Sequence, residues 1–176
     1  MRAKKINESI LKGKSNDEVI QALNNLNLDS NDLLIKTVGL GILDGVKKAL
    51  NNGVSVKAKN FALQWAVVYN QLKVIKLLLD KGADIHTDDN YALRLAAERG
   101  YLEVVKLLLR SGADVHANND YALRYAAYNG HLDMVKLLLR NGADVHAVDN
   151  YALRNTTSNG HLEVVNYLNK WIEDEG

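Results

Sequence analysis

Two sets of glycines in this sequence have the residue types of a nucleotide site, but their spacing is wrong. The triplet Gly13-Lys14-Ser15 has the form of the end of a phosphate-binding loop, yet that motif needs another glycine five residues before the first, where Glu8 stands. Gly39, Gly41 and Gly45 are spaced one residue too wide for a dinucleotide fingerprint, and no strand is expected before them. Neither set predicts nucleotide binding.

The five histidines occupy only two positions of a repeated pattern. His86, His116 and His146 share one position, and His131 and His161 share the other. Copies one unit apart should lie roughly 10 Å from each other, whereas zinc–nitrogen bonds are about 2 Å long. The sequence also has no cysteine, and no nucleophile, base and orienting carboxylate stand in a recognised order. We therefore predict structural histidines, no metal, no cofactor and no catalysis.

Composition favours one elongated intracellular domain. A chain of 176 residues with 47% hydrophobic content can bury a continuous core. No apolar run approaches the roughly 18 residues of a membrane span, and a cysteine-free chain suits the reducing cell interior. We therefore expect a cytoplasmic monomer without a membrane partner. The net charge of +1 provides no global attraction for nucleic acid, so a partner must be recognised locally.

A repeat of 30 residues is the main feature of the chain. Copies of a five-residue segment, Asn/Asp-Tyr/Phe-Ala-Leu-Arg/Gln, begin at residues 60, 90, 120 and 150. Copies of Gly-Ala-Asp begin at residues 82, 112 and 142, and Gly53 marks a weaker copy 29 residues upstream. A fixed period of this length predicts one supersecondary unit that is stacked several times.

Each unit is predicted to contain two helices. In the unit from residue 90, a helix should run from Tyr91 to Arg99 and stop at Gly100. A second helix follows, with an apolar stripe at helical spacing (Leu102, Val105, Leu108 and Leu109), and Gly112 should end it in a left-handed conformation. The stretch 113–120 is a connector. One pair cannot bury its own leucine face, so the pairs must stack into a solenoid.

These residues resemble the ankyrin repeat, most closely at 130–146, which is similar to that family's second helix and exit. The resemblance covers about 31 to 176 and implies an all-α solenoid of stacked antiparallel helix pairs with short connecting loops. The period is 30 instead of about 33, and the missing residues lie where the family projects β-hairpin fingers. The fingers should therefore be short and the helix faces more important. This shortened version is similar to ankyrin proteins of giant DNA viruses of amoebae.

We divide the chain into an N-terminal helical cap and five units: 1–30, then 31–59, 60–89, 90–119, 120–149 and 150–176. The first and last units should be capping repeats, because polar residues replace apolar ones there, namely Lys36, Thr37, Thr156 and Thr157. We expect these on the outward side of the end units, where they keep an open stack soluble.

Within the N-terminal cap, Ser15 and Glu18 have the spacing of a capping box at the start of an amphipathic helix. This helix should cover the first unit. A separate docking helix is the alternative.

Candidate binding residues are those that vary between units on an exposed face, because residues that repeat build the scaffold. By the ankyrin resemblance they line the concave side of the first helices: Trp65, Tyr69, Glu98, Arg99, Tyr125 and Tyr128. Tryptophan, tyrosine and arginine most often carry interface hot spots, worth about 2 kcal/mol or more each. The first hypothesis is a non-catalytic protein–protein interaction module, a viral factor that binds a host protein. Packing of Trp65 and Tyr125 against the next unit is the alternative.

Two repeated rows complete the set of candidates. Phe61 and the tyrosines at its position in later units are interpreted as a packing ladder. Arg94, Arg124 and Arg154 form an arginine row. Their guanidinium groups could bond neighbouring loop carbonyls, or they could form a basic stripe for carboxylates or phosphates. The second hypothesis is therefore nucleic-acid or anionic-ligand binding through the arginine row.

Overall fold

The computed structural model describes residues 14–26 and 28–175, and these ranges contain eleven α-helices and no strand. The helices are α1 (Asn16–Asn24), α2 (Ser30–Gly39), α3 (Leu43–Asn51), α4 (Val56–Val68), α5 (Leu72–Asp80), α6 (Thr87–Glu98), α7 (Leu102–Arg110), α8 (Ala117–Tyr128), α9 (Leu132–Arg140), α10 (Ala147–Ser158) and α11 (Leu162–Glu175). The expected all-α solenoid of antiparallel helix pairs is confirmed.

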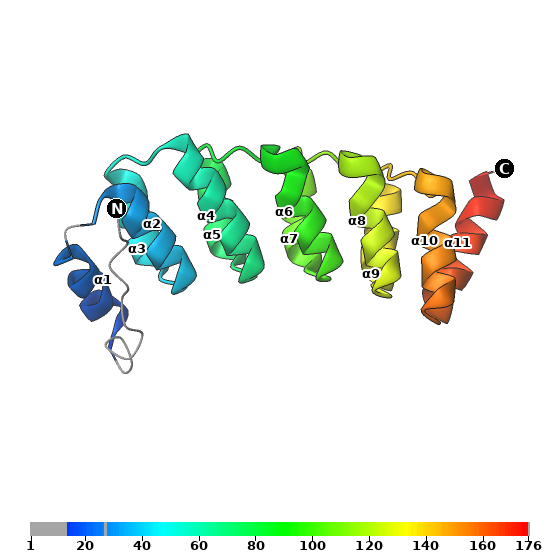
Figure 1. Cartoon of the computed structure of the whole chain (residues 1–176), viewed down its shortest axis with the longest axis horizontal. Coiled ribbons are helices and arrows are strands. Elements are labelled where there is room, and N and C mark those ends of the chain that lie inside the picture. Colours follow the sequence, from blue (N-terminus) through cyan, green and yellow to red (C-terminus); the bar gives the residue numbers. More distant parts are fainter. Residues whose placement is uncertain (1–13, 27, 176) are drawn as a thin grey trace.

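Five helix pairs follow one another along the long axis, from α2 and α3 to α10 and α11, with α1 beside the first pair (Figure 1). The first helices of the pairs (α2, α4, α6, α8 and α10) pack more closely on one another than the second helices do. A stack that is tighter on one side curves toward that side. The first helices therefore line the concave side of the array.

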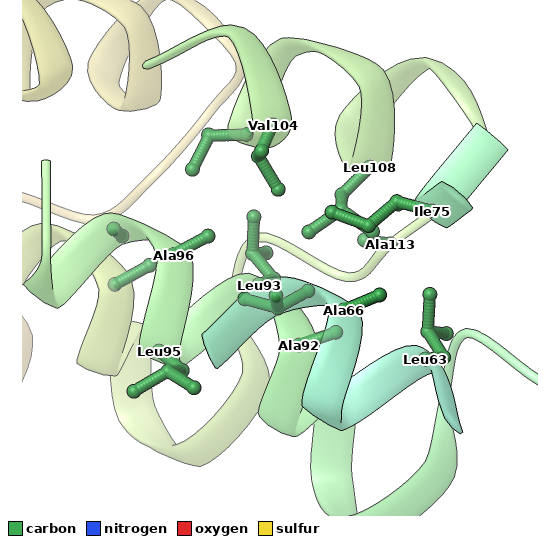
Figure 2. Packing of buried hydrophobic residues seen from close by; sticks show 14 of the residues in the cluster. Leu63, Ala66, Ile75, Ala92, Leu93, Leu95, Ala96, Val104, Leu108 and Ala113 are labelled. Carbon is green, nitrogen blue, oxygen red and sulfur yellow. The ribbon is translucent and has the colours of Figure 1, made fainter. Parts of the chain in front are cut away.

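Alanines and leucines at repeated positions form one continuous core. Ala96, Ala97 and Leu93 of α6 are fully buried, as is Leu108 of α7. Figure 2 shows residues of α4 and α5 among those of α6 and α7, so the core crosses the boundary between units. The small alanines let the first helices approach closely, and each buried leucine contributes roughly 2 kcal/mol.

The connectors fold into a left-handed turn that was not anticipated. Asp88, Asp89 and Asn90 have φ angles of 51°, 56° and 53°, so the right-handed part of α6 begins at Tyr91. The same turn recurs at 118–120 and 148–150. Asn and Asp tolerate this conformation better than other side chains, and the turn lies between the Gly-Ala-Asp segment and the right-handed part of the next first helix. At the other end, Gly112 has a φ of 94°, as the helix-stop prediction requires.

The capping box at the start of α1 is confirmed. The backbone N–H of Ser15 donates to Glu18 Oε2 (2.7 Å), and the backbone N–H of Glu18 donates to Ser15 Oγ (3.3 Å). The bond from the Ser15 backbone N–H, followed by one that the Ser15 hydroxyl donates to the same carboxylate oxygen (3.0 Å), holds the pKa of Glu18 below its usual value. Val19 and Leu23 are buried in the core that the first unit shares, so α1 covers that unit. Residues 1–13, which include Gly13 of the glycine–lysine–serine triplet, lie outside the described residues.

The expectation that polar residues of the end units face outward is wrong for Thr37 and Thr156, which are both fully buried. They stand at the buried alanine position of the first helix. The Thr37 hydroxyl donates to the Leu33 carbonyl (2.8 Å), and this bond offsets the cost of burying the hydroxyl. Gly45 of α3 has no side chain, which leaves room for the methyl group that threonine has and alanine lacks. Thr156 Oγ1 has no hydrogen-bond partner among the described residues.

Candidate functional site

The concave side presents four positions from each first helix and the residue that caps its C-terminus, and together we call these positions the first-helix face. They are residues 32, 35, 36, 39 and 40 of α2; 61, 64, 65, 68 and 69 of α4; 91, 94, 95, 98 and 99 of α6; 121, 124, 125, 128 and 129 of α8; and 151, 154, 155, 158 and 159 of α10. All except Leu95 are exposed or half-buried. Eight of the eleven aromatic residues of the chain stand in this face, so aromatic side chains are concentrated on one side of the molecule.

On α4, three rings form an exposed strip, which we call the aromatic strip: Phe61, Trp65 and Tyr69. Their side chains are 47%, 37% and 48% exposed. Trp65 stacks on Tyr69 with ring centroids 5.6 Å apart and meets Phe61 edge-on at 6.0 Å. The exposure of Phe61 contradicts its interpretation as a packing residue. A cleft of about 350 Å³ borders the strip, with Lys57 and Thr87 in its lining.

On α8, the tyrosines form a more closely packed cluster. Tyr125 stacks on Tyr121 with centroids 4.0 Å apart, and the Tyr151 ring of α10 lies 6.1 Å from it. Tyr125 therefore packs against the next unit, which was the alternative interpretation for this residue. Tyr128, whose ring is 6.0 Å from Tyr125, stays 40% exposed.

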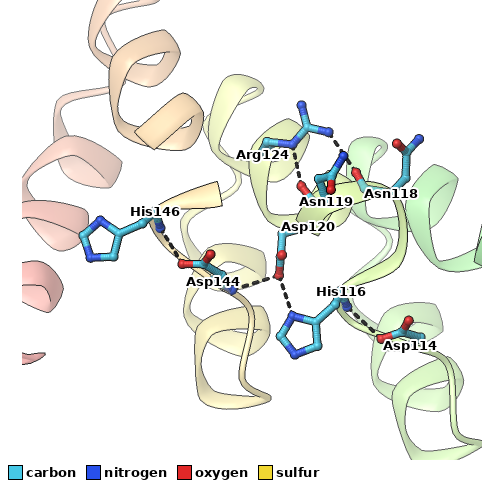
Figure 3. Close-up of polar contacts among 8 residues, drawn as sticks. All are labelled: Asp114, His116, Asn118, Asn119, Asp120, Arg124, Asp144 and His146. Atoms are coloured by element: carbon cyan, nitrogen blue, oxygen red, sulfur yellow. Dashed lines mark hydrogen bonds and ion pairs between the residues drawn. The ribbon is translucent and has the colours of Figure 1, made fainter. Parts of the chain in front are cut away.

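The arginine row is bonded to loop carbonyls. Arg124 donates from Nε to the carbonyl of Asn119 (2.8 Å) and from Nη2 to that of Asn118 (2.9 Å), as Figure 3 shows. Arg94 bonds its own left-handed turn in the same way, with two bonds of 2.9 Å. Arg154 donates to the Val148 carbonyl over a longer distance, 3.3 Å. These bonds supply the partners that the turn carbonyls would otherwise lack, as the structural interpretation of the row expects.

Arginine and tyrosine side chains alternate across three units. The Arg94 guanidinium lies 5.7 Å from the Tyr91 ring centroid and 5.2 Å from that of Tyr121. Arg124 lies 5.7 Å from Tyr121 and 5.0 Å from Tyr151. Each such cation–π contact contributes roughly 0.5–1 kcal/mol. The stack covers ring faces on α6, α8 and α10. No arginine or lysine among the described residues lies over the rings of the aromatic strip, where Gln64 stands at the arginine position.

Glu98 and Arg99 differ in their surroundings. Glu98 Oε2 accepts a hydrogen bond from the Tyr121 hydroxyl (3.0 Å), and its backbone carbonyl accepts one from Asn129 Nδ2 (3.1 Å). Burial, followed by this bond to Glu98, raises the pKa of Tyr121 to about 12. Burial also raises the pKa of Tyr151, with a further contribution from Tyr125. Glu98 thus joins two units, while Arg99 is exposed.

A ladder of buried amide and carboxylate side chains, which sequence reasoning missed, fixes the spacing between units. The backbone N–H of Asp114 donates to Asn90 Oδ1 (2.9 Å), and that of Asp144 donates to Asp120 Oδ1 (2.8 Å; Figure 3). His116 Nδ1 lies 3.1 Å from the same Asp120 oxygen. The sequence signal that could have predicted this ladder is the Asn or Asp that precedes the aromatic residue at the start of each repeated five-residue segment. Through these contacts, the connectors hold neighbouring units together.

Comparison with known families identifies ankyrin repeats in the chain. A family model described as "Ankyrin repeats (3 copies)" matches residues 93–174, and one described as "Ankyrin repeats (many copies)" matches residues 63–109. No curated protein matches the sequence.

Residues 14–26 and 28–175 hold no cluster of three or more His, Cys, Asp or Glu side chains suited to a metal ion. None of the helices in these ranges has the length and apolar character needed to cross a membrane.

Proposed function

Because the chain carries ankyrin repeats over residues 63–174, and such repeats generally mediate protein–protein interaction, we propose that it is a non-catalytic module that binds a protein partner through the first-helix face. The observation that carries the proposal is the aromatic strip. Three neighbouring rings on one helix remain between a third and a half exposed, on the concave side of the stack. Exposed aromatic groups of this kind mark interaction sites.

The candidate residues divide into two roles. Trp65, Tyr69, Arg99 and Tyr128 are exposed, and they are the residues proposed to contact the partner. The other four candidates are engaged within the array, and they are proposed to hold the face in shape: Arg94, Glu98, Arg124 and Tyr125. Truncation of the first group should weaken binding, and truncation of the second should first lower stability.

The shortened 30-residue repeat is the ground for a narrower proposal. Its similarity in style to repeats of giant DNA viruses of amoebae suggests a viral factor that occupies a host protein in the host cytoplasm. An amoebal lysate is therefore the first source in which to seek the partner.

Binding of nucleic acid through the arginine row is the competing hypothesis. Two N–H donors of Arg94 and two of Arg124 are already bonded to turn carbonyls, and tyrosine rings flank both guanidinium groups. Three of the five N–H donors of each group remain, but the bonds and the flanking rings fix the guanidinium groups in the array and limit the directions from which a phosphate can reach them. Salt distinguishes the two hypotheses, because phosphate binding weakens steeply as salt rises, whereas an aromatic-centred interface responds mildly.

Affinity capture followed by quantitative mass spectrometry tests the proposal. The wild-type chain is compared with a face variant, Trp65→Ala with Tyr128→Ala, and with a matched control on the second helices, Leu72→Ala with Leu162→Ala. All four side chains are exposed, so both variants should fold. We expect a captured protein to be retained by the control and lost by the face variant. Equal retention by both variants would refute the site.

A further inference from the structure

The charges of the first-helix face are unbalanced, although the whole chain is nearly neutral. The face holds five cationic side chains and two acidic ones: Lys36, Arg94, Arg99, Arg124 and Arg154 against Asp32 and Glu98. The net charge of the chain is only +1. The remaining carboxylates of the described residues therefore lie on the connectors, the second helices and α1. The concave side is basic and the rest of the described surface compensates for it.

Two of these cations flank the aromatic strip. Lys36 of α2 stands at the position that Trp65 occupies in α4, and Arg99 of α6 stands at the position of Tyr69. Both helices pack directly on α4, and packed helices are about 8–10 Å apart. Neither head group forms an ion pair with the residues that the structure describes. Each side of the strip thus has one cation whose charge is available to a ligand.

The rest of the face is less suited to a polyanion. The Arg94 and Arg124 guanidinium groups are bonded to turn carbonyls and covered by rings. Stacked nucleobases would need free aromatic faces in line with free cations. Among the described residues of the first-helix face, three neighbouring exposed rings flanked by cations without ion pairs occur at the aromatic strip. A ligand with one apolar anchor and a few separated carboxylates fits this pattern better than a nucleic acid does.

We propose that the occupant of the aromatic strip is an acidic segment of the partner protein. One aromatic or aliphatic side chain of the segment rests on Trp65 and Tyr69, and carboxylates on either side of it face Lys36 and Arg99. The inference rests on the proposed function, because it names the chemistry of the partner at the same site.

The spacing of the helices defines the segment further. Lys36 and Arg99 belong to helices on opposite sides of α4, so the segment must span about 16–20 Å. An extended chain covers about 3.3 Å per residue, which places the carboxylates roughly three residues before and after the anchor. The segment would run across the first helices, along the stack.

Selection from a library of random 16-residue peptides displayed on phage tests this inference. Selected peptides are synthesised with a fluorescent label, and their affinity is measured by anisotropy for the wild type, for Trp65→Ala and for Lys36→Glu with Arg99→Glu. A control with the same change of charge on exposed second-helix residues is Lys76→Glu with Arg110→Glu. Thermal melts monitored by circular dichroism check that each variant folds.

We expect the selected peptides to combine acidic residues with an apolar anchor and to bind Trp65→Ala weakly. They should bind the Lys36→Glu, Arg99→Glu variant about tenfold more weakly than the control variant. Selection repeated on that reversed variant should yield basic peptides.

Other outcomes overturn the inference in distinguishable ways. Neutral or basic peptides that still depend on Trp65 would refute the acidic segment and leave the proposed function standing. Peptides that bind regardless of Trp65 would count against both. A failure to select any peptide would refute a short acidic segment, and the capture experiment would still decide the proposed function. Stronger competition by a single-stranded thymidine oligonucleotide than by the peptides would favour the nucleic-acid hypothesis.

Discussion

Replacing Val148 by asparagine should stabilise the protein, although valine is the more hydrophobic residue. Val148 has a φ of 54° and a ψ of 56°, the left-handed conformation. The corresponding residues of the two preceding units are Asp88 and Asn118, which tolerate this conformation. For an ordinary L-residue it costs roughly 1–2 kcal/mol, and a β-branched side chain belongs at the upper end of that range.

The expected gain is the strain relieved minus the burial lost. Val148 is 46% exposed, so the substitution forfeits at most about half of the roughly 1.5 kcal/mol that a buried valine contributes. Relief of about 1.5–2 kcal/mol of strain leaves a net stabilisation of about 1 kcal/mol. For a chain of this length that corresponds to an increase in Tm of about 3 °C.

Urea and thermal unfolding, both monitored by circular dichroism, measure the effect. The reciprocal substitution Asn118→Val is the matched control, and it should lower the free energy of unfolding by at least as much as Val148→Asn raises it. If Val148→Asn lowered stability while Asn118→Val had no effect, the left-handed turn would not carry the cost assigned to it.

Four further substitutions, one of them a control, test three separate features of the structure. Thr156→Val should stabilise the chain by about 1 kcal/mol, because it removes a buried hydroxyl that has no hydrogen-bond partner among the described residues. Thr37→Val should not stabilise it, because this substitution removes the hydrogen bond to the Leu33 carbonyl. Urea unfolding of both variants measures the difference. Asn90→Ala should cost roughly 1–3 kcal/mol and accelerate hydrogen exchange at the Asp114 amide, and unchanged exchange would contradict the ladder. The pKa of Tyr121, raised from 10.0 to about 12, favours the neutral phenol in the folded state, so this contribution to stability is complete below pH 10 and is lost as the pH rises toward 12. Tyr121→Phe should therefore flatten the fall in Tm across that window, and a fall as steep as in the wild type would count against the raised pKa of Tyr121.

The repeat made much of the fold predictable, because periodic features depend only on nearby residues. The stripe through Leu108 and the stop at Gly112 follow from helical spacing and glycine conformation, and the box at Ser15 follows from a three-residue interval. Thr37 and Thr156 were misplaced for a different reason. Polarity alone suggested exposure, but a threonine can replace a buried alanine when its hydroxyl finds a carbonyl one turn earlier, or when the site tolerates an unpaired one.

Contacts between units could not be predicted from the sequence as fully as the features within one unit. The bond from Asp114 to Asn90 joins residues 24 positions apart, and its geometry depends on how two units stack. The same holds for Trp65 and Tyr125, which occupy one repeat position. Their exposures differ because the Tyr125 ring packs against the Tyr151 ring of the next unit, whereas Trp65 has Lys36 and Leu95 at the same position of its neighbouring units. Side-chain exposure at a repeated position is therefore a property of neighbouring units.

Site-specific photocrosslinking tests most directly whether the first-helix face binds a protein. The chain has no cysteine, so a thiol-attached photocrosslinker can be placed at one position at a time through Tyr69→Cys, Tyr128→Cys or, on the second helices, Lys76→Cys. Irradiation in an amoebal lysate should join the same protein to positions 69 and 128 and not to position 76. Crosslinking of that protein at position 76 alone would contradict the central claim.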